Sequence, residues 1–272
     1  MPGYQNIILE KDADTHIARL TFNRPDKRNA LDDSTMEELG DALEDVEADD
    51  SVRVLILTGA GRSFCAGGDL ESLPGGAEPG DWASENVDDI RRGFRKVQRF
   101  MLCLQRMEKP VIAMVNGSAV GAGFDIACAC DIRIGSPQAR FMVAYVRIGL
   151  FPGFGGTWLY PRMLGSIGKA AELLFTGDFL EAEEAYRLGF LNKLVPQEDL
   201  EKVTLEMAEK IACGPPIAIR LSKLMLYKGL EFDLDTAMRM AAAAETITLT
   251  SKDHLEGTAA IRESRKPVYG GG

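Results

Sequence analysis

Two stretches of the chain, about 57 residues apart, follow the same plan, and this repeat restricts the possible folds more than any other feature. RVLILTGAGRSFCAGGDL and PVIAMVNGSAVGAGFDI each run from an apolar segment through a glycine and a short bridge to three small residues and an acid. A continuous apolar run that ends in glycine is typical of a strand buried on both faces. The sequence therefore predicts two successive strand-and-helix units whose small-residue stretches lie side by side.

The small residues of both stretches are expected to open helices. The first N–H groups of a helix have no partner within it and carry the positive end of its dipole, and small side chains let a ligand carbonyl approach the backbone. Two such amides on one carbonyl oxygen form an oxyanion hole, in which each donor contributes about 3 to 4 kcal/mol. Helix-on-sheet packing would explain either stretch alone, but their repetition favours the oxyanion hole.

Composition excludes several classes of protein. The 272 residues carry a formal net charge of −10, which disfavours binding to nucleic acid or to an anionic membrane surface. No stretch reaches the ~18 apolar residues of a membrane span. The five cysteines form no Cys-x-x-Cys pair and are expected to be free thiols in the cytoplasm.

Few residues are available for the common kinds of active site. The only histidines are His16 and His254, too few for a two-histidine metal site and a poor basis for a catalytic triad. The chain has no Gly-x-Ser-x-Gly motif, and its glycine-rich segments do not complete a dinucleotide or phosphate loop. Chemistry must therefore come from backbone amides, carboxylates or tyrosines.

Four motifs, in order, resemble the crotonase, or enoyl-CoA hydratase/isomerase, superfamily, and the resemblance covers about residues 7–265. They are NRPDKRNAL (23–31), LILTGAGRSFCAGGDL (55–70), KPVIAMVNGSAVGAGFDIACACDIRIG (109–135) and IGLFPGFGGTWLYPRMLG (148–165). The resemblance implies an α/β fold, with a spiral of repeated ββα units in residues 1–200. It also implies a C-terminal helical region in residues 201–272 that forms a homotrimer or a hexamer built as a dimer of trimers.

The resemblance also implies the substrate and the residues that bind it. Family substrates are acyl-CoA thioesters, whose enolate is stabilised by two amides that correspond here to Ala66 and Ala122. The segment Ala66, Gly67, Gly68 and Asp69 would line the path of the CoA and thioester. The loop that approaches the CoA phosphates corresponds to the segment with Arg24, Lys27 and Arg28. No metal, flavin or nicotinamide is required, because the CoA is part of the substrate.

The chain departs from the family pattern at the catalytic acids. Family hydratases carry one glutamate at the position of Asp125 and a second at the position of Tyr145. We expect Asp125 to be the general acid and base and Tyr145 to assist it. A helix-capping role for Asp125 and a packing role for Tyr145 are the alternatives. Another acid could replace the missing glutamate; the candidates are Glu71, Asp81, Glu85 and Asp88.

Three functions are compatible with these residues, and we rank them as follows. A hydratase of enoyl-, dienoyl- or cyclic acyl-CoA is favoured, and an enoyl- or dienoyl-CoA isomerase follows because one carboxylate can remove and return the same proton. The related ring-opening-pathway isomerases carry an extra aspartate where this chain has Gly153. The third possibility is a catalytically degenerate member that only binds acyl-CoA.

Overall fold

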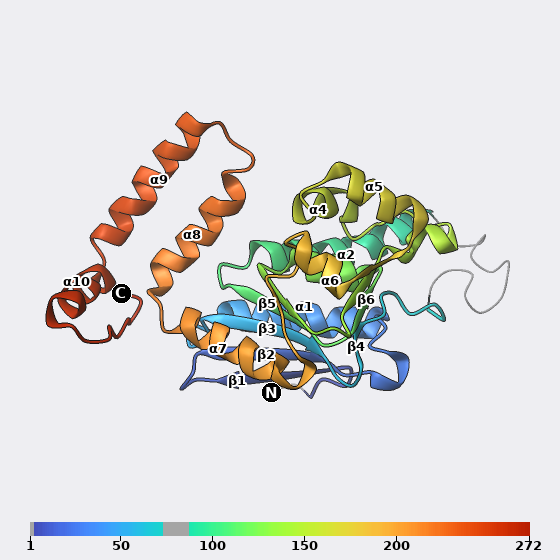
Figure 1. Ribbon diagram of the computed structural model, residues 1–272, viewed down its shortest axis with the longest axis horizontal. Helices are drawn as coiled ribbons and strands as arrows, with labels where there is room; N and C mark the ends of the chain where they lie inside the picture. The colour runs from blue at the N-terminus through green and yellow to red at the C-terminus, as the bar shows by residue number, and fades with distance from the viewer. Residues whose placement is uncertain (1–2, 73–86) are drawn as a thin grey trace.

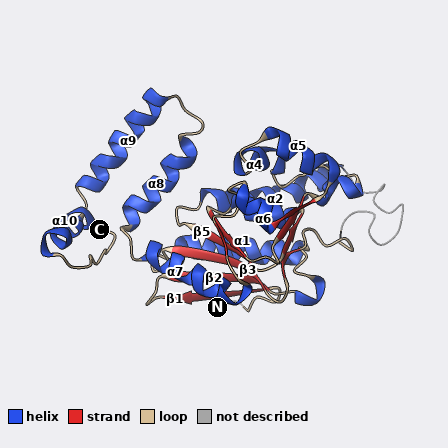
Figure 2. Cartoon of the chain, in the orientation of Figure 1, coloured by secondary structure: helices blue, strands red, loops and turns tan. Residues whose placement is uncertain are grey.

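Two β-sheets with helices packed around them form the body of the protein in the computed structural model, which describes residues 3–72 and 87–272 (Figures 1 and 2). The larger sheet has six strands in the order β1-β2-β3-β5-β7-β10 and the smaller has four in the order β4-β6-β8-β9. The larger sheet contains β1 (Ile7–Asp12), β2 (Ile17–Phe22), β3 (Val54–Gly59), β5 (Val111–Val115), β7 (Ile132–Gly135) and β10 (Lys193–Leu194). The smaller contains β4 (Ser63–Cys65), β6 (Ser118–Val120), β8 (Arg140–Met142) and β9 (Phe179–Glu181).

The chain reaches these sheets by repeating one unit of two strands and a helix. After the antiparallel pair β1 and β2 and helix α1, each unit contributes its first strand to the larger sheet and its second to the smaller. The units are β3-β4-α2, β5-β6-α3 and β7-β8-α4, and consecutive units pair in parallel through β3 with β5 and β4 with β6. This arrangement is the predicted spiral of ββα units. The helices are α1 (Asp33–Ala48), α2 (Val87–Arg106), α3 (Ala122–Ala129), α4 (Gly156–Met163), α5 (Ile167–Thr176), α6 (Ala182–Arg187), α7 (Leu200–Ala212), α8 (Pro216–Lys228), α9 (Leu234–Leu249) and α10 (Lys252–Glu263).

Strand β3 explains why the apolar runs of the repeat are continuous. Leu55 and Leu57 face the core shared with α1, α2 and α3, whereas Val54 and Ile56 pack with residues of α7, among them Ala208. Because successive side chains of a strand point to opposite faces, a sheet covered on both sides requires apolar residues at every position. The run VLILTG is therefore buried along its whole length.

Helix α1 forms where the apolar residues have helical spacing. Met36, Leu39, Leu43 and Val46 are all buried and lie on the face toward the core. Asp32 caps the N-terminus, since its carboxylate accepts the Thr35 amide at 2.8 Å.

The C-terminal helices α8, α9 and α10 extend away from the sheets, as Figure 1 shows in orange and red. The second half of α8 is fixed to the core by Asp131, which forms an ion pair with Lys223 at 2.7 Å and accepts the hydroxyl of Tyr227 at 2.8 Å. The same carboxylate accepts the Val111 amide at the start of β5, so it holds α8 and the larger sheet together. In neither described range does a helix have the length and apolar character needed to cross a membrane.

One expectation about local structure is wrong. Residues 66–69 do not open a helix but pair with Leu31, whose amide donates to the carbonyl of Gly67 at 2.8 Å and whose carbonyl accepts the Asp69 amide at 2.8 Å. Gly67 has a φ of +84°, which a helix cannot contain. The helix-dipole reasoning therefore applies to Ala122 and not to the first stretch.

Two helical glycines should respond in opposite ways to replacement by alanine. A Cβ on Gly123 in α3 would lie 2.3 Å from the Cys65 carbonyl oxygen, whereas a Cβ on Gly40 in α1 would meet nothing within 4 Å. We expect Gly123→Ala to lower the free energy of unfolding by about 1 to 3 kcal/mol through overpacking. The matched change Gly40→Ala should raise it by about 0.5 to 1 kcal/mol. Urea denaturation measures both, and equal effects would contradict the close packing at Gly123.

Candidate active site

Asp125 lies in the first turn of α3, and the fold removes it completely from water. All eight residues of α3 are buried, and the exposed fraction of Asp125 is 0%. The helix begins after Gly121, whose carbonyl accepts the Asp125 amide at 3.1 Å. The carboxylate makes no hydrogen bond to the start of its own helix, and its Oδ2 instead accepts the hydroxyl of another residue, Tyr145. The alternative that Asp125 is a capping residue does not match this geometry.

Tyr145 is the hydrogen-bond partner of Asp125. It belongs to the 3₁₀ helix η3 (Ala144–Ile148), and its hydroxyl donates to Oδ2 of Asp125 at 2.5 Å. Burial raises the pKa of Asp125 to about 6, while the hydrogen bond from Tyr145 acts to lower it. Burial and the nearby Asp125 raise the pKa of Tyr145 well above its usual value near 10, so the phenol remains a proton donor. The structure therefore brings together the two residues that the sequence predicted as catalytic.

A second tyrosine, Tyr160 of α4, lies against the same carboxylate. Its side chain is fully buried, and its ring stacks on Phe124 with ring centroids 5.0 Å apart. Its hydroxyl is close enough to lower the pKa of Asp125, although neither Tyr160 Oη nor Asp125 Oδ1 completes a hydrogen bond of ordinary geometry. Sequence analysis missed Tyr160 because nothing in its local motif distinguishes it from a core aromatic residue.

The two predicted oxyanion segments lie next to each other. A Cβ on Gly67 would be only 3.3 Å from the amide nitrogen of Ala122 and 2.6 Å from the carbonyl oxygen of Val120. Glycine at position 67 is therefore required by its neighbours as well as by its positive φ. The Ala66 amide, however, donates to the Arg28 carbonyl at 3.1 Å, so this donor is already engaged in the structure. The amide of Ala122 lies at the first position of α3, where the helix itself supplies no acceptor.

A cleft of about 1020 Å³ leads to these segments. Ala66 and Val120 line its wall close to the two amides, whereas Asp125 is not among the lining residues. Gly68 and Asp69 also border the cleft, whereas Gly67 does not. The charged lining residues of the cleft are four cations, Lys27, Arg28, Arg62 and Arg140, and four acids, Asp26, Asp69, Glu71 and Glu181.

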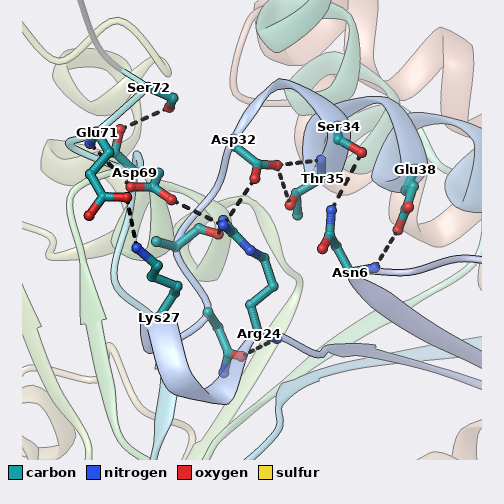
Figure 3. Close-up of polar contacts among 12 residues, drawn as sticks. Asn6, Arg24, Lys27, Asp32, Ser34, Thr35, Glu38, Asp69, Glu71 and Ser72 are labelled. Carbon is teal, nitrogen blue, oxygen red and sulfur yellow. Dashed lines mark hydrogen bonds and ion pairs between the residues drawn. The ribbon is translucent and has the colours of Figure 1, made fainter. Parts of the chain in front are cut away.

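Arg24 has a different environment from the one expected. Its guanidinium contacts Asp32 Oδ2 at 3.0 Å and Asp69 Oδ2 at 3.1 Å, and it donates to the Ala30 carbonyl at 2.7 Å (Figure 3). It does not line the cleft. Arg24 therefore supports the loop and holds Asp69, because two carboxylates already compensate its charge. Lys27 borders the cleft but is paired with Glu71 at 2.8 Å.

The other candidate acids do not approach Asp125 in the part of the chain that the structure describes. Glu71 is exposed and forms the ion pair with Lys27, and Asp88 lies 3.8 Å from Arg91 on α2. Asp81 and Glu85 lie outside the described residues. Among residues 3–72 and 87–272, no acidic side chain contacts Asp125 in the way expected of a second catalytic glutamate.

The opposite end of α3 is occupied by Arg133. Its guanidinium donates to the carbonyls of Cys130 at 2.6 Å and Ala127 at 3.4 Å, and its Nε donates to Phe190 at 2.7 Å. A buried cation thus satisfies the carbonyl end of the helix whose amide end faces the oxyanion segment.

The described residues contain no group of three or more His, Cys, Asp or Glu side chains that could hold a metal ion.

Arg62 and Arg140 are further residues of the cleft that the sequence did not reveal. Arg62 lies within the quoted motif GAGRSF, so its position beside the small residues was the available signal. Arg140 is placed by β8, where it donates to Ser118 Oγ at 3.0 Å and its guanidinium lies 4.3 Å from the ring centre of Phe179.

The chain is similar to known proteins over nearly its whole length. Residues 12–272 match the family model described as enoyl-CoA hydratase/isomerase. The chain is 39% identical to crotonyl-CoA hydratase of Syntrophomonas wolfei over 270 residues, which cover 98% of each protein. It is 34% identical to 1,2-epoxyphenylacetyl-CoA isomerase of Escherichia coli, over 94% of this chain and 95% of that protein. The crystal structure of enoyl-CoA hydratase from Bacillus anthracis superposes with a TM-score of 0.90 at 36% identity, over 98% of this chain and 100% of that one.

The predicted superfamily, fold and type of enzyme are confirmed by these similarities. The match to the family model and the identity to the relatives both extend far beyond the four motifs. The chain belongs to the enoyl-CoA hydratase/isomerase family.

Proposed function

We propose that the protein is an enoyl-CoA hydratase in which Asp125 is the general acid and base. The observation that carries the proposal is the position of one buried carboxylate in the first turn of α3, three residues after the amide of Ala122. In hydration, Asp125 takes a proton from water as the water oxygen bonds to the β carbon of the enoyl group. Negative charge develops on the thioester oxygen, and Asp125 then returns the proton to the α carbon.

The amides of Ala122 and Ala66 are the proposed donors to that oxygen. Ala122 stands at the positive end of α3, and Gly67 brings the two segments within contact distance. Because Ala66 donates to the Arg28 carbonyl, a thioester oxygen must share this amide or displace that carbonyl. Arg28 has a φ of +53° and the next residue, Asn29, a φ of +59°, so the loop at this contact has an uncommon backbone conformation.

Tyr145 is proposed to transmit or orient the proton that Asp125 handles. It is partly exposed, whereas Asp125 is not, and its ring lies over the turn that begins α3. Its Cζ is 3.9 Å from the point where a Cβ on Gly121 would be. A water bound in front of Tyr145 would therefore be near both the phenol and the oxyanion segment.

The cationic side chains of the cleft are the proposed contacts of the CoA phosphates. Arg28, Arg62 and Arg140 border it together with Lys27, although the net charge of the chain is −10. Arginine side chains bind phosphate oxygens through paired N–H donors. The mechanism needs no cofactor apart from this CoA, because backbone amides and one carboxylate supply the chemistry.

Isomerisation is the second candidate, since one carboxylate can move a proton between carbons and an isomerase is among the relatives. Against it stands Gly153, where the related ring-opening-pathway isomerases carry an aspartate. A Cβ at this position would be 2.6 Å from Cε1 of Phe94 in α2, so this aromatic ring occupies the space. A degenerate acyl-CoA binder is disfavoured by the Asp125–Tyr145 contact, which leaves an acid and a phenol paired in the core.

We also propose that the C-terminal helices join copies of the chain into a trimer or a dimer of trimers. Helix α9 has no buried residue, and the three helices expose many large apolar side chains. Such side chains favour burial against another surface. The exposed residues of these helices are Leu224, Leu226, Leu234, Met238, Ile247, Leu249, Leu255 and Ile261, and Leu230 is exposed in the connection between α8 and α9. The cytoplasm stays the expected compartment, in keeping with free cysteines at all five positions.

The change Asp125→Asn should remove catalysis without removing binding. The amide keeps the size of the side chain and can accept the Tyr145 hydroxyl, but it cannot take a proton, so turnover should fall by about 10²- to 10⁴-fold. Assays use crotonyl-CoA and longer, dienoyl- and cyclic acyl-CoAs in heavy water, with acyl-CoA affinity measured by calorimetry. Water addition by the unmodified enzyme identifies a hydratase, and deuterium uptake with a shifted double bond identifies an isomerase. Turnover of Asp125→Asn within tenfold of the unmodified enzyme would contradict the role of Asp125.

The acid side of the pH profile should report Asp125. The reaction needs its ionised form, so kcat/KM should fall as the pH drops below about 6, the raised pKa of this group. Tyr145→Phe removes a hydrogen bond that lowers this pKa, and the fall should then begin at higher pH. A profile that is flat between pH 5 and 7 would contradict proton transfer by Asp125.

Arg62→Ala should weaken binding of CoA esters. Arg62 borders the cleft and forms no ion pair with the described residues, so its removal should raise KM about tenfold, equivalent to ~1.4 kcal/mol, and leave kcat unchanged. The matched control is Arg187→Ala on α6, an exposed arginine away from the cleft. A phosphate role also predicts that the loss is much smaller for acyl-pantetheine substrates, which lack the nucleotide. An equal loss for both substrates would refute it.

A further inference from the structure

Two buried polar atoms without a hydrogen bond face the same point beside Gly156. A Cβ on this glycine would lie 2.6 Å from Cζ of Tyr160 and 2.7 Å from Oδ1 of Asp125. The hydroxyl of Tyr160 and Oδ1 of Asp125 are both buried and both lack a partner. Buried polar atoms are rarely left unpaired, because burial without a hydrogen bond costs free energy. Their shared location requires an explanation.

Neither atom is free to turn toward another partner. The ring of Tyr160 is stacked on Phe124, the residue before Asp125, and it is enclosed on all sides with an exposed fraction of 0%. The other carboxylate oxygen, Oδ2, already accepts the Tyr145 hydroxyl. The Tyr160 hydroxyl nevertheless acts to lower the pKa of Asp125, so the two groups are close enough to interact.

We propose that Tyr160 is a positioning residue for Asp125, whose ionised carboxylate binds the Tyr145 hydroxyl through Oδ2 and the Tyr160 hydroxyl through Oδ1. This inference rests on the proposed role of Asp125 as general base. Tyr160 transfers no proton; its hydroxyl donates while Asp125 is charged and loses the bond when Asp125 carries the proton. The enzyme thus replaces the partner acid of a two-carboxylate site by two neutral donors, one on each oxygen.

The surroundings of Asp125 support neutral donors as its only partners. The titratable groups around it are Tyr145 from η3, Tyr160 from α4 and Cys128 from α3 itself, and Cys65 from β4 lies near Tyr145. Burial raises the pKa of the Cys65 thiol to about 12 and that of Cys128 well above its usual value, so both remain protonated. No basic side chain among the described residues contacts the carboxylate. Phenol hydroxyls are the groups that can stabilise its charge.

The test is the change Tyr160→Phe, which removes one oxygen and keeps the ring on Phe124. The protein is labelled with ¹³C at the aspartate carboxyl carbons, and the resonance of Asp125 is assigned by its loss in Asp125→Asn. We expect the titration midpoint of Asp125 to rise by about 0.5 to 1 pH unit, and the acid limb of kcat/KM to move with it. The KM for acyl-CoA at pH 8 should not change. Tyr186→Phe, at an exposed tyrosine on α6, is the matched control and should leave the midpoint unchanged.

The outcomes separate this inference from the proposed function. An unchanged or lowered midpoint in Tyr160→Phe overturns the positioning role, whatever the enzyme catalyses. A raised midpoint in a protein that converts no acyl-CoA leaves the Tyr160 contact intact and refutes the hydratase assignment instead. The thermal unfolding midpoint verifies that the variant is folded. If it falls sharply, Tyr145→Phe/Tyr160→Phe is compared with Tyr145→Phe alone, and equal carboxylate midpoints in that pair overturn the proposal.

Discussion

The direct contact between the backbone after β4 and the first turn of α3 is the constraint on which the site depends. Gly123 lies against the Cys65 carbonyl, and Gly67 lies against Val120 and the Ala122 amide, so neither interface has room for a Cβ. This contact brings the backbones of two consecutive ββα units together. A small shift between the units would separate the two amides and also move Asp125, which lies three residues after Ala122 in the same helix.

Asp125 illustrates how a core can hold an acid without a cationic partner. An isolated buried carboxylate is strongly disfavoured, and a neighbouring arginine or lysine would stabilise its charge so strongly that it became a poor base. Phenol donors are a compromise, because they lower the pKa of the acid against the effect of burial without adding a positive charge. The resulting pKa of about 6 suits the role proposed for Asp125, in which it takes and releases a proton near neutral pH.

Much of the fold could be predicted from the sequence because short local patterns of apolar residues and glycines determine its strands and helices. The apolar runs at β3 and β5, the spacing of Met36, Leu39 and Leu43 in α1, and the repeated glycines predicted elements that the structure contains. The helical opening at residues 66–69 was wrong because pairing with Leu31, a contact distant in sequence, determines that segment. Tyr160 was missed for the same reason, since the role proposed for it depends on its contact with a carboxylate 35 positions earlier in the chain.

Among the described residues, only one end of the helix α3 dipole is neutralised by a charged side chain. Arg133 neutralises the carbonyl end, so the field of the helix is compensated at one end and open at the other. A neutral thioester gains little from an open positive end, but an oxygen that acquires charge gains more as the charge grows. In the proposed reaction, the helix would therefore stabilise the charged transition state more than the bound, neutral substrate.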